Sequence, residues 1–272
     1  MSAPPVGRHE IVKTRGGALA MRSVEAGEVM HPGVAPVVEA EQLYIRQSRL
    51  EDRLRAQPAL VVYDVGLGAG SNAFAARAAS ERAPAGAARL TLISFERDLG
   101  ALALALEHAG DFAIEPEAVA AGRALLATGA HESRRTSWRL VTGDVLPALQ
   151  RELPAADIVF WDPFSPRANP ALWTVGAFAA ARRRAAARCT LFTYSASTAT
   201  RVALLLAGWC AGVGASIGDK AATTAAAISA DDLVAPLDRD WLRRLSRADV
   251  PLPADAPADF ATTIARLPQF AR

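Results

Sequence analysis

The stretch that decides the fold is Val61-Val62-Tyr63-Asp64-Val65-Gly66-Leu67-Gly68-Ala69-Gly70. A short apolar run, typical of a buried strand, ends in an acid and passes into three alternating glycines. Glycine lets the backbone approach a ligand closely, and a helix that begins after the loop offers free N–H groups. The pattern therefore predicts a strand–loop–helix unit of an α/β protein, with a small-molecule site at the carboxyl end of the strand.

The spacing of the glycines distinguishes a dinucleotide-binding loop from one that binds S-adenosylmethionine. A dinucleotide-binding loop that starts at Gly66 needs its third glycine at position 71, which is Ser71. Here the glycines stand at 66, 68 and 70, and Asp64 lies two residues before the first. We therefore predict that Asp64, Gly66, Gly68 and Gly70 border the amino-acid end of S-adenosylmethionine. Taken alone, the loop is also compatible with a plain glycine-rich turn.

Further short apolar runs follow along the chain and are separated by helical stretches. This alternation is typical of a parallel sheet with crossover helices. Five parallel strands, closed by an antiparallel C-terminal pair, predict an α/β fold with a Rossmann-like seven-stranded methyltransferase sheet. The runs cover residues 60–63, 90–95, 138–141, 157–161 and 189–194, followed by a weaker pair near 212–217 and 223–228.

The segments that flank these runs suggest three parts. Helical spacing from Pro36 to Leu54 predicts an N-terminal helical extension, and a hairpin is possible near Ile11 to Arg22. The stretch from His108 to Thr136 is long for one crossover, so we expect an extra helix there. The expected parts are an extension whose helix covers the cofactor site (1–57), a methyltransferase domain (58–230) and a C-terminal tail packed on that domain (231–272).

Two more acids follow successive strands of the predicted sheet. Phe95-Glu96 ends the second run, and Gly143-Asp144 follows the third. A carboxylate at Glu96 can accept both ribose hydroxyls, and Asp144 can accept from the adenine amino group. Each acid alone is compatible with a helix cap or a turn residue. Because the carboxyl ends of parallel strands meet at one edge, we predict that both acids bind the cofactor there.

The fourth run ends in Phe160-Trp161-Asp162-Pro163-Phe164-Ser165-Pro166. It is similar to the Asp/Asn-Pro-Pro-aromatic loop of methyltransferases that act on amino groups. An amine must present its lone pair to the methyl carbon, so Asp162 should hold its N–H and help to deprotonate it. Pro163 stiffens the loop, and Phe164 can flank a planar group or the cationic methyl. Without the upstream motifs, an Asp-Pro turn is the competing interpretation.

Composition limits the function classes. A net charge of +2 neither requires nor excludes a nucleic-acid partner, because a local patch can suffice. Cys189 and Cys210 lie in apolar runs, which favours buried reduced thiols. The sequence has no metal-ligand spacing and no apolar signal core, and its longest uncharged stretch, 202–218, is shorter than a membrane span. We therefore expect a soluble cytoplasmic protein without a metal or a membrane segment.

Several segments together resemble the MnmC-type methyltransferase family. The most specific is Asp162-Pro-Phe-Ser-Pro-Arg-Ala-Asn-Pro-Ala-Leu-Trp173, and the resemblance extends from about residue 28 to 230. It implies transfer of a methyl group from S-adenosylmethionine to the 5-aminomethyl group of a modified uridine at the tRNA wobble position. The other segments that carry it are residues 31–45, 64–73, 95–98 and 193–196.

The resemblance also has implications for individual residues. It puts Glu39 and Tyr44 near the cofactor, although their own pattern is that of helix-surface residues. For contact with tRNA, Arg167 and Lys220 are the candidates by position. Some members fuse this domain to a flavin oxidase, and the chain ends where that domain would begin, so it resembles the stand-alone form.

One departure from the family keeps alternatives open. Members often carry a charged pair after the lysine that corresponds to Lys220, where this chain has Ala221 and Ala222. If that segment holds substrate or RNA, the acceptor differs. The alternatives are a methyltransferase for another amine, such as a small metabolite or a protein side chain, and a non-catalytic binding protein of the same fold.

Overall fold

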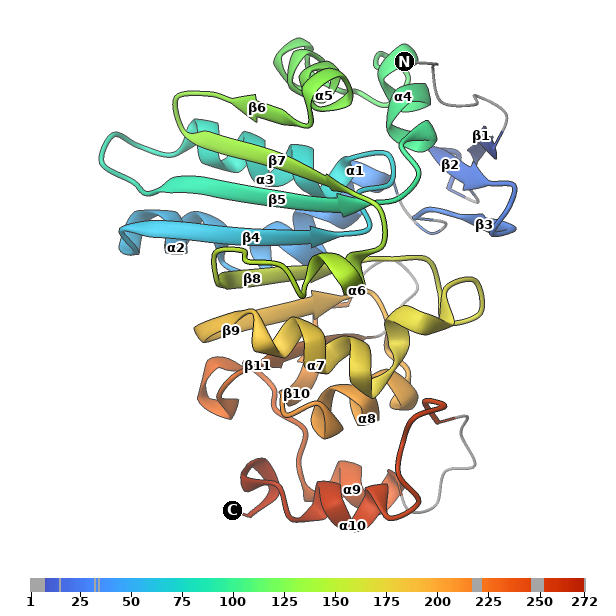
Figure 1. The fold of residues 1–272 in the computed structure, drawn as a ribbon, viewed down its shortest axis with the longest axis vertical. Coiled ribbons are helices and arrows are strands. Elements are labelled where there is room, and N and C mark those ends of the chain that lie inside the picture. Colours follow the sequence, from blue (N-terminus) through green and yellow to red (C-terminus); the bar gives the residue numbers. More distant parts are fainter. Residues whose placement is uncertain are drawn as a thin grey trace.

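The computed structural model describes residues 8–14, 16–31, 33, 35–216, 222–245 and 252–271. An eight-stranded sheet in the order β10-β11-β9-β8-β4-β5-β7-β6 forms its centre (Figure 1). Five of these strands are parallel, and β10 and β11 close one edge as an antiparallel pair, which confirms the predicted fold class. The seven are β4 (Ala59–Val65), β5 (Arg89–Glu96), β7 (Thr136–Thr142), β8 (Ala156–Trp161), β9 (Ala185–Thr193), β10 (Cys210–Gly214) and β11 (Thr223–Ala227).

The sheet has one strand more than the seven predicted. β6 (Ala130–Glu132) pairs antiparallel with β7 at the far edge. It follows α5 (Pro116–Thr128), the extra helix expected in this region, and Gly129 with a φ of 76° turns the chain back. Three residues with no buried side chain carry no alternating pattern, so the sequence could not indicate this strand.

Side chains of the strands alternate between two cores, one on each face of the sheet. On β4, Leu60 and Val62 belong to the first core, and Tyr63 and Val65 to the second. Burial on both faces explains why the parallel strands read as continuous apolar runs. Helices α2 (Leu50–Ala56), α3 (Ser71–Arg82), α4 (Gly100–Glu107) and α5 cover the first core, and α6 (Val145–Ala148), α7 (Val175–Arg183) and α8 (Thr198–Leu206) cover the second.

The N-terminal extension carries strands in addition to the predicted helix. β1 (His9–Lys13), β2 (Leu19–Ser23) and β3 (Glu28–Val29) form a separate antiparallel sheet, whose first two strands are the hairpin expected near Ile11 to Arg22. In Figure 1 this small sheet lies on the side toward which the arrowheads of β4 and β5 point. The N-terminal strands therefore stand at the carboxyl edge of the main sheet, where a ligand is expected.

The helix predicted from Pro36 to Leu54 is interrupted. It runs as α1 (Pro36–Glu39), then as a π-helix, η2 (Ala40–Arg46), and resumes as α2 after Arg49, whose φ is 54°. The Ser48 hydroxyl donates to the carbonyls of Tyr44 and Ile45. Such side-chain bonds compete with the backbone ladder and explain the break, which helical periodicity alone does not reveal.

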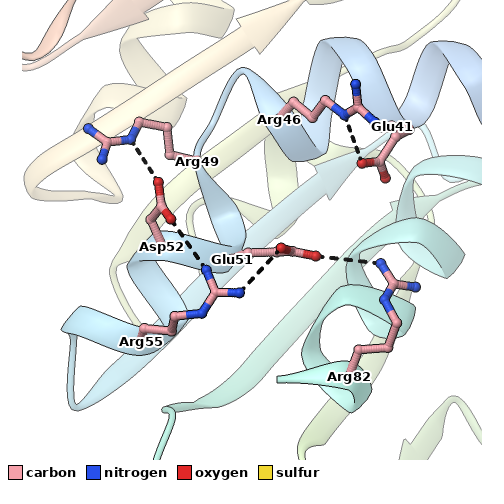
Figure 2. Close-up of polar contacts among 7 residues, drawn as sticks. All are labelled: Glu41, Arg46, Arg49, Glu51, Asp52, Arg55 and Arg82. Atoms are coloured by element: carbon pink, nitrogen blue, oxygen red, sulfur yellow. Dashed lines mark hydrogen bonds and ion pairs between the residues drawn. The ribbon is translucent and has the colours of Figure 1, made fainter. Parts of the chain in front are cut away.

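Ion pairs connect α2 to the helix beside it (Figure 2). Glu51 on α2 contacts both Arg55 on its own helix and Arg82 at the end of α3, and Asp52 contacts Arg49 and Arg55. All five side chains are largely exposed, so each pair stabilises the fold by about 0–1 kcal/mol. These arginines are compensated by acids and do not form a bare basic surface.

The C-terminal segment packs against α8 and β10. Its elements are η4 (Ala230–Asp232), α9 (Arg239–Leu245), α10 (Phe260–Ala265) and η5 (Pro268–Phe270). Leu245, Ile264 and Phe270 share a small core with Val202 and Leu205 of α8. In the part of the chain that the structure describes, no helix is long and apolar enough to cross a membrane, and no cluster of three metal-ligating side chains occurs.

Candidate functional site

The sheet grows in opposite directions from the junction of β4 and β8. The chain proceeds from β4 to β5 and β7 on one side, and from β8 to β9 on the other. Open α/β sheets bind ligands in the crevice at such a switch point. Backbone bonds hold the strand ends together there: the Gly66 N–H donates to the Phe95 carbonyl at 3.1 Å, and the Asp162 N–H donates to the Val65 carbonyl at 2.9 Å.

The backbone of the glycine loop strongly favours glycine. Gly66, Gly68 and Gly70 have φ values of 89°, 52° and 91°, in the left-handed region that other residues avoid. A Cβ atom on Gly66 would lie 2.7 Å from the carbonyl oxygen of Asp162, and one on Gly68 would lie 3.1 Å from the Met30 sulfur. The loop is thus pressed between the end of β8 and a side chain of the N-terminal extension.

Asp64 is fully buried at the end of β4. One carboxylate oxygen accepts from the Ser94 hydroxyl at 2.7 Å, and that hydroxyl accepts from the Trp138 indole at 3.0 Å. The other oxygen, Oδ1, has no hydrogen-bond partner among the described residues. Burial raises the pKa of Asp64 to about 7, against the lowering effect of Ser94. Asp64 is therefore an acceptor that lacks a donor, as expected of a ligand-binding carboxylate.

Glu96 fastens the glycine loop to the end of β5. Its Oε1 accepts from the N–H groups of Arg97 at 2.8 Å and Asp98 at 3.0 Å, and its Oε2 accepts from the Gly68 N–H at 3.0 Å. Burial raises its pKa, while these three bonds lower it. A carboxylate has about four acceptor positions, so one remains for a further hydroxyl. The predicted acceptance of two ribose hydroxyls would require one of the three bonds to open.

Asp144 lies beside Glu96 on the outer rim. It is exposed at the start of α6, and the preceding residue, Gly143, donates its N–H to the Glu96 carbonyl at 2.9 Å. The acids Asp162, Asp64, Glu96 and Asp144 thus lie at or just after the carboxyl ends of four neighbouring strands, β8, β4, β5 and β7, in that order across the sheet.

Asp162 lies in a cluster of titratable groups. The Asn72 amide donates to its Oδ2 at 2.7 Å. Burial raises the pKa of Asp162 to about 6; His31 opposes this effect and Glu39 adds to it. The Nδ1 atom of His31 lies 3.6 Å from the Glu39 carboxylate. Tyr44 is fully buried, and burial, Asp162 and Glu39 raise its pKa well above the usual range. Glu39 and Tyr44, which only the resemblance singled out, are therefore next to the site.

The loop 162–165, which we call the acceptor loop, is held through its carbonyl groups. The Tyr194 hydroxyl donates to the Pro163 carbonyl at 3.2 Å, and the Trp173 indole donates to the Phe164 carbonyl at 2.8 Å. The two donor rings pack edge to face, with their centroids 5.7 Å apart. The loop therefore has a defined backbone path that leaves the Phe164 side chain half-buried.

The N-terminal sheet holds the same loop from β3. Glu28 accepts from both the N–H of Ser165, at 3.0 Å, and its hydroxyl. Arg167 approaches the same carboxylate at 3.4 Å, while its side chain stays 77% exposed. Arg167 thus stands at the rim of the site with its guanidinium largely in water. Lys220, the other predicted substrate residue, lies outside the described residues.

Sequence reasoning missed several residues that shape the site. Asn72 is the second residue of α3 and offered a weak signal, because helix starts after such loops face the ligand. Ser94 lies at a buried position of β5, where the sequence pattern indicates a residue of the core. Glu28 gave no signal at all, since its partner Ser165 lies 137 residues further along the chain.

Comparison with known proteins agrees with this geometry. A family model described as S-adenosyl-L-methionine-dependent methyltransferase matches residues 121–229. The tRNA 5-methylaminomethyl-2-thiouridine biosynthesis bifunctional protein MnmC of Azoarcus sp. is 31% identical over 194 residues, which are 69% of this chain and 31% of that protein. The chain is thus similar to the MnmC-type S-adenosyl-L-methionine-dependent methyltransferases. The matching family model indicates an enzyme of the methyltransferase class with S-adenosylmethionine as its cofactor.

Two further relatives extend the likeness beyond the central sheet. The protein of the same name from Ralstonia nicotianae is 28% identical over 237 residues, which are 85% of this chain and 35% of that protein. The solved structure of MNMC2 from Aquifex aeolicus shares the fold, with a TM-score of 0.71 and 24% identity, and the match covers 94% of this chain and 83% of that one. The chain spans about a third of the length of the curated relatives it matches.

Proposed function

We propose that this methyltransferase transfers a methyl group to the 5-aminomethyl group of the wobble uridine in tRNA. The observation that carries the proposal is the acceptor loop, which presents the half-buried carboxylate of Asp162 beside the end of β4. The names of the Azoarcus and Ralstonia relatives, which refer to the biosynthesis of 5-methylaminomethyl-2-thiouridine in tRNA, support this choice of substrate.

The residues at the strand ends fit S-adenosylmethionine. The buried Asp64 Oδ1 lacks a donor, which the cofactor's ammonium group would supply. We propose that Asp64, Gly66, Gly68 and Gly70 bind the methionine end, with the backbone close to the ligand. When bound, the cofactor supplies an electrophilic methyl group on its sulfonium.

The order of the acids across the sheet supports the roles of the remaining cofactor residues. Glu96 keeps an acceptor position for a ribose hydroxyl, and Asp144 lies next to it, where the adenine amino group would follow. Glu39 and Tyr44 lie on the opposite side, next to Asp162. We propose that they border the reacting end of the cofactor rather than its adenine.

In the proposed mechanism, Asp162 holds and deprotonates the acceptor amine. The free amine exists mostly as ammonium at neutral pH, so a proton must leave before the nitrogen lone pair can attack. A carboxylate whose pKa is raised to about 6 is ionised at pH 7 and is a better proton acceptor than an exposed aspartate. Asn72 fixes Oδ2 and thereby orients the carboxylate. The remaining acceleration would come from alignment of amine and methyl group.

The experiment that tests the function supplies tRNA carrying 5-aminomethyl wobble uridine together with methyl-labelled cofactor. We expect label in tRNA with the wild-type chain and little with Asp162→Ala. A parallel reaction offers a small primary amine in place of tRNA. Label in the small amine but not in tRNA would overturn the tRNA substrate and leave a methyltransferase for another amine. No methylation of either, despite cofactor binding, would favour a non-catalytic binding protein.

A further inference from the structure

The contact between β3 and the acceptor loop joins two parts of the chain that neither sheet connects. β3 is fixed in the N-terminal sheet, where Glu28 pairs with Ser23 and Val29 pairs with Arg22. Its Glu28 side chain, 16% exposed, reaches Ser165 of the main domain. Two donors of the same residue converge on this carboxylate, and charge-assisted bonds of this kind are about twice as strong as neutral ones.

Ser165 is the point at which the acceptor loop turns into the following segment. Its hydroxyl accepts from the Arg167 N–H at 3.3 Å, and its carbonyl accepts from the N–H groups of Ala168 at 3.0 Å and Asn169 at 2.8 Å. A shift of Ser165 therefore moves both the turn and the loop before it. The path of the loop back to Asp162, three residues earlier, therefore depends on Ser165 as well as on Tyr194 and Trp173.

We propose that Glu28 is a positioning residue, which sets the acceptor loop so that the Asp162 carboxylate faces the amine. The proposal rests on the proposed function of Asp162, but not on the identity of the amine. Glu28 acts through Ser165, and Arg167 contributes little because its contact is long and exposed. Misplacement by about 1 Å costs up to roughly a hundredfold in rate, so a distant support of this kind matters for turnover.

The first test measures the loop itself and needs no acceptor. Hydrogen–deuterium exchange of the full chain is followed by mass spectrometry over residues 163–169. We expect Glu28→Ala to raise exchange there roughly tenfold, which corresponds to about 1.4 kcal/mol of lost protection. Glu28→Gln, which keeps one acceptor oxygen, should fall between Glu28→Ala and the wild type.

The matched control is Glu25→Gln. Glu25 lies in the turn of the same sheet and pairs with Arg8 in water, away from the loop. Its substitution should leave exchange over residues 163–169 unchanged. Equal exchange in Glu28→Ala and the wild type, with both proteins folded and binding cofactor, would overturn the proposal.

The second test separates positioning from general stability. With the acceptor that the wild type methylates, Glu28→Ala should lower kcat by ten- to a hundredfold and leave cofactor affinity within about twofold. Ser165→Ala, which keeps the backbone N–H donor, should lower kcat less than Glu28→Ala, and the double variant should be no worse than Glu28→Ala alone. Effects that simply add would overturn the proposal. If the wild type methylates no acceptor, the proposed function has failed, and the exchange experiment still decides the role of Glu28 in holding the loop.

Discussion

Asp64 and Asp162, at the ends of neighbouring strands, differ in the hydrogen-bond donors that contact their carboxylates. Asp64 receives one bond from Ser94 and leaves its other oxygen without a donor among the described residues, whereas Asp162 is oriented by Asn72. Burial raises both pKa values, to about 7 for Asp64 and about 6 for Asp162. Desolvation of these two carboxylates therefore lowers the stability of the fold, at the place where a cationic cofactor and an amine would bind.

The raised pKa of Asp64 predicts how stability depends on pH. Its folded pKa of about 7 exceeds the ordinary value of 3.8, so the folded state holds more protons between these limits, and the group's contribution to stability falls as pH rises through that window. Asp64→Asn removes this cost. We expect the difference in unfolding free energy between the variant and the wild type to shift in the variant's favour by roughly 2–4 kcal/mol from pH 4 to pH 8.

Urea unfolding of both proteins at the two pH values measures this difference, with Asp52→Asn, on the exposed face of α2, as the control. The same variant should bind S-adenosylmethionine more weakly, because an amide replaces the carboxylate that we propose for the ammonium group. A stability difference that does not change with pH would show that Asp64 does not titrate in this range.

Asp162 predicts the pH dependence of turnover. The base must be ionised, so kcat/KM with a methylated amine should fall as pH decreases through about 6. Asp162→Asn keeps the shape and loses the charge; it should lower kcat at least a hundredfold while cofactor affinity stays within a few-fold. Steady-state kinetics and calorimetry measure the two quantities. Turnover within a few-fold of wild type would reduce Asp162 to a turn residue.

At the scale of elements, the sequence predicted what is local and missed what is not. The unit β4–glycine loop–α3 was readable because an apolar run, an acid and three glycines are contiguous. The helix break at Arg49 depends on the Ser48 hydroxyl, and β6 depends on the turn at Gly129. Neither feature changes the periodic spacing of apolar residues, so the sequence pattern does not indicate them. At the site, the strand-end acids could be predicted, whereas supports such as Glu28 could not.

The glycine loop predicts the effect of one added methyl group. In Gly66→Ala the new Cβ would stand 2.7 Å from the Asp162 carbonyl, so the end of β8 must move. The left-handed backbone adds a strain of about 1–2 kcal/mol. Gly86→Ala is the matched control, because Gly86 has nearly the same φ, 88°, and nothing lies within 4 Å of its Cβ position. Both variants should lose stability in thermal unfolding, but only Gly66→Ala should also lose cofactor affinity.

At the scale of the whole molecule, charge is balanced rather than concentrated. The net charge is +2, and the arginines around α2 are paired with acids (Figure 2). Arg184 and Arg182 donate to backbone carbonyls, and Arg188 pairs with Asp232. For the proposed tRNA substrate, the largely exposed guanidinium of Arg167 beside the acceptor loop is the candidate contact.

The exposed guanidinium of Arg167 predicts a local contribution to tRNA affinity. Arg167→Glu should weaken tRNA binding several-fold and reduce its dependence on salt, because fewer counterions are released. Arg183→Glu, at the end of α7, changes the net charge equally and serves as the control. Filter binding at several salt concentrations distinguishes the two. Equal losses in both variants would point to net charge instead of a contact at Arg167.

The contact between Glu28 and Ser165 has a consequence for how the chain is made. The two residues are 137 positions apart, and ribosomes add about 5–20 residues per second, so Ser165 is synthesised roughly 7–27 s after Glu28. During that interval the nascent N-terminal segment has no acceptor loop to grip. A partly synthesised chain therefore carries Glu28 without its partner, and the acceptor loop gains all its contacts only after Trp173 and Tyr194 have also been made.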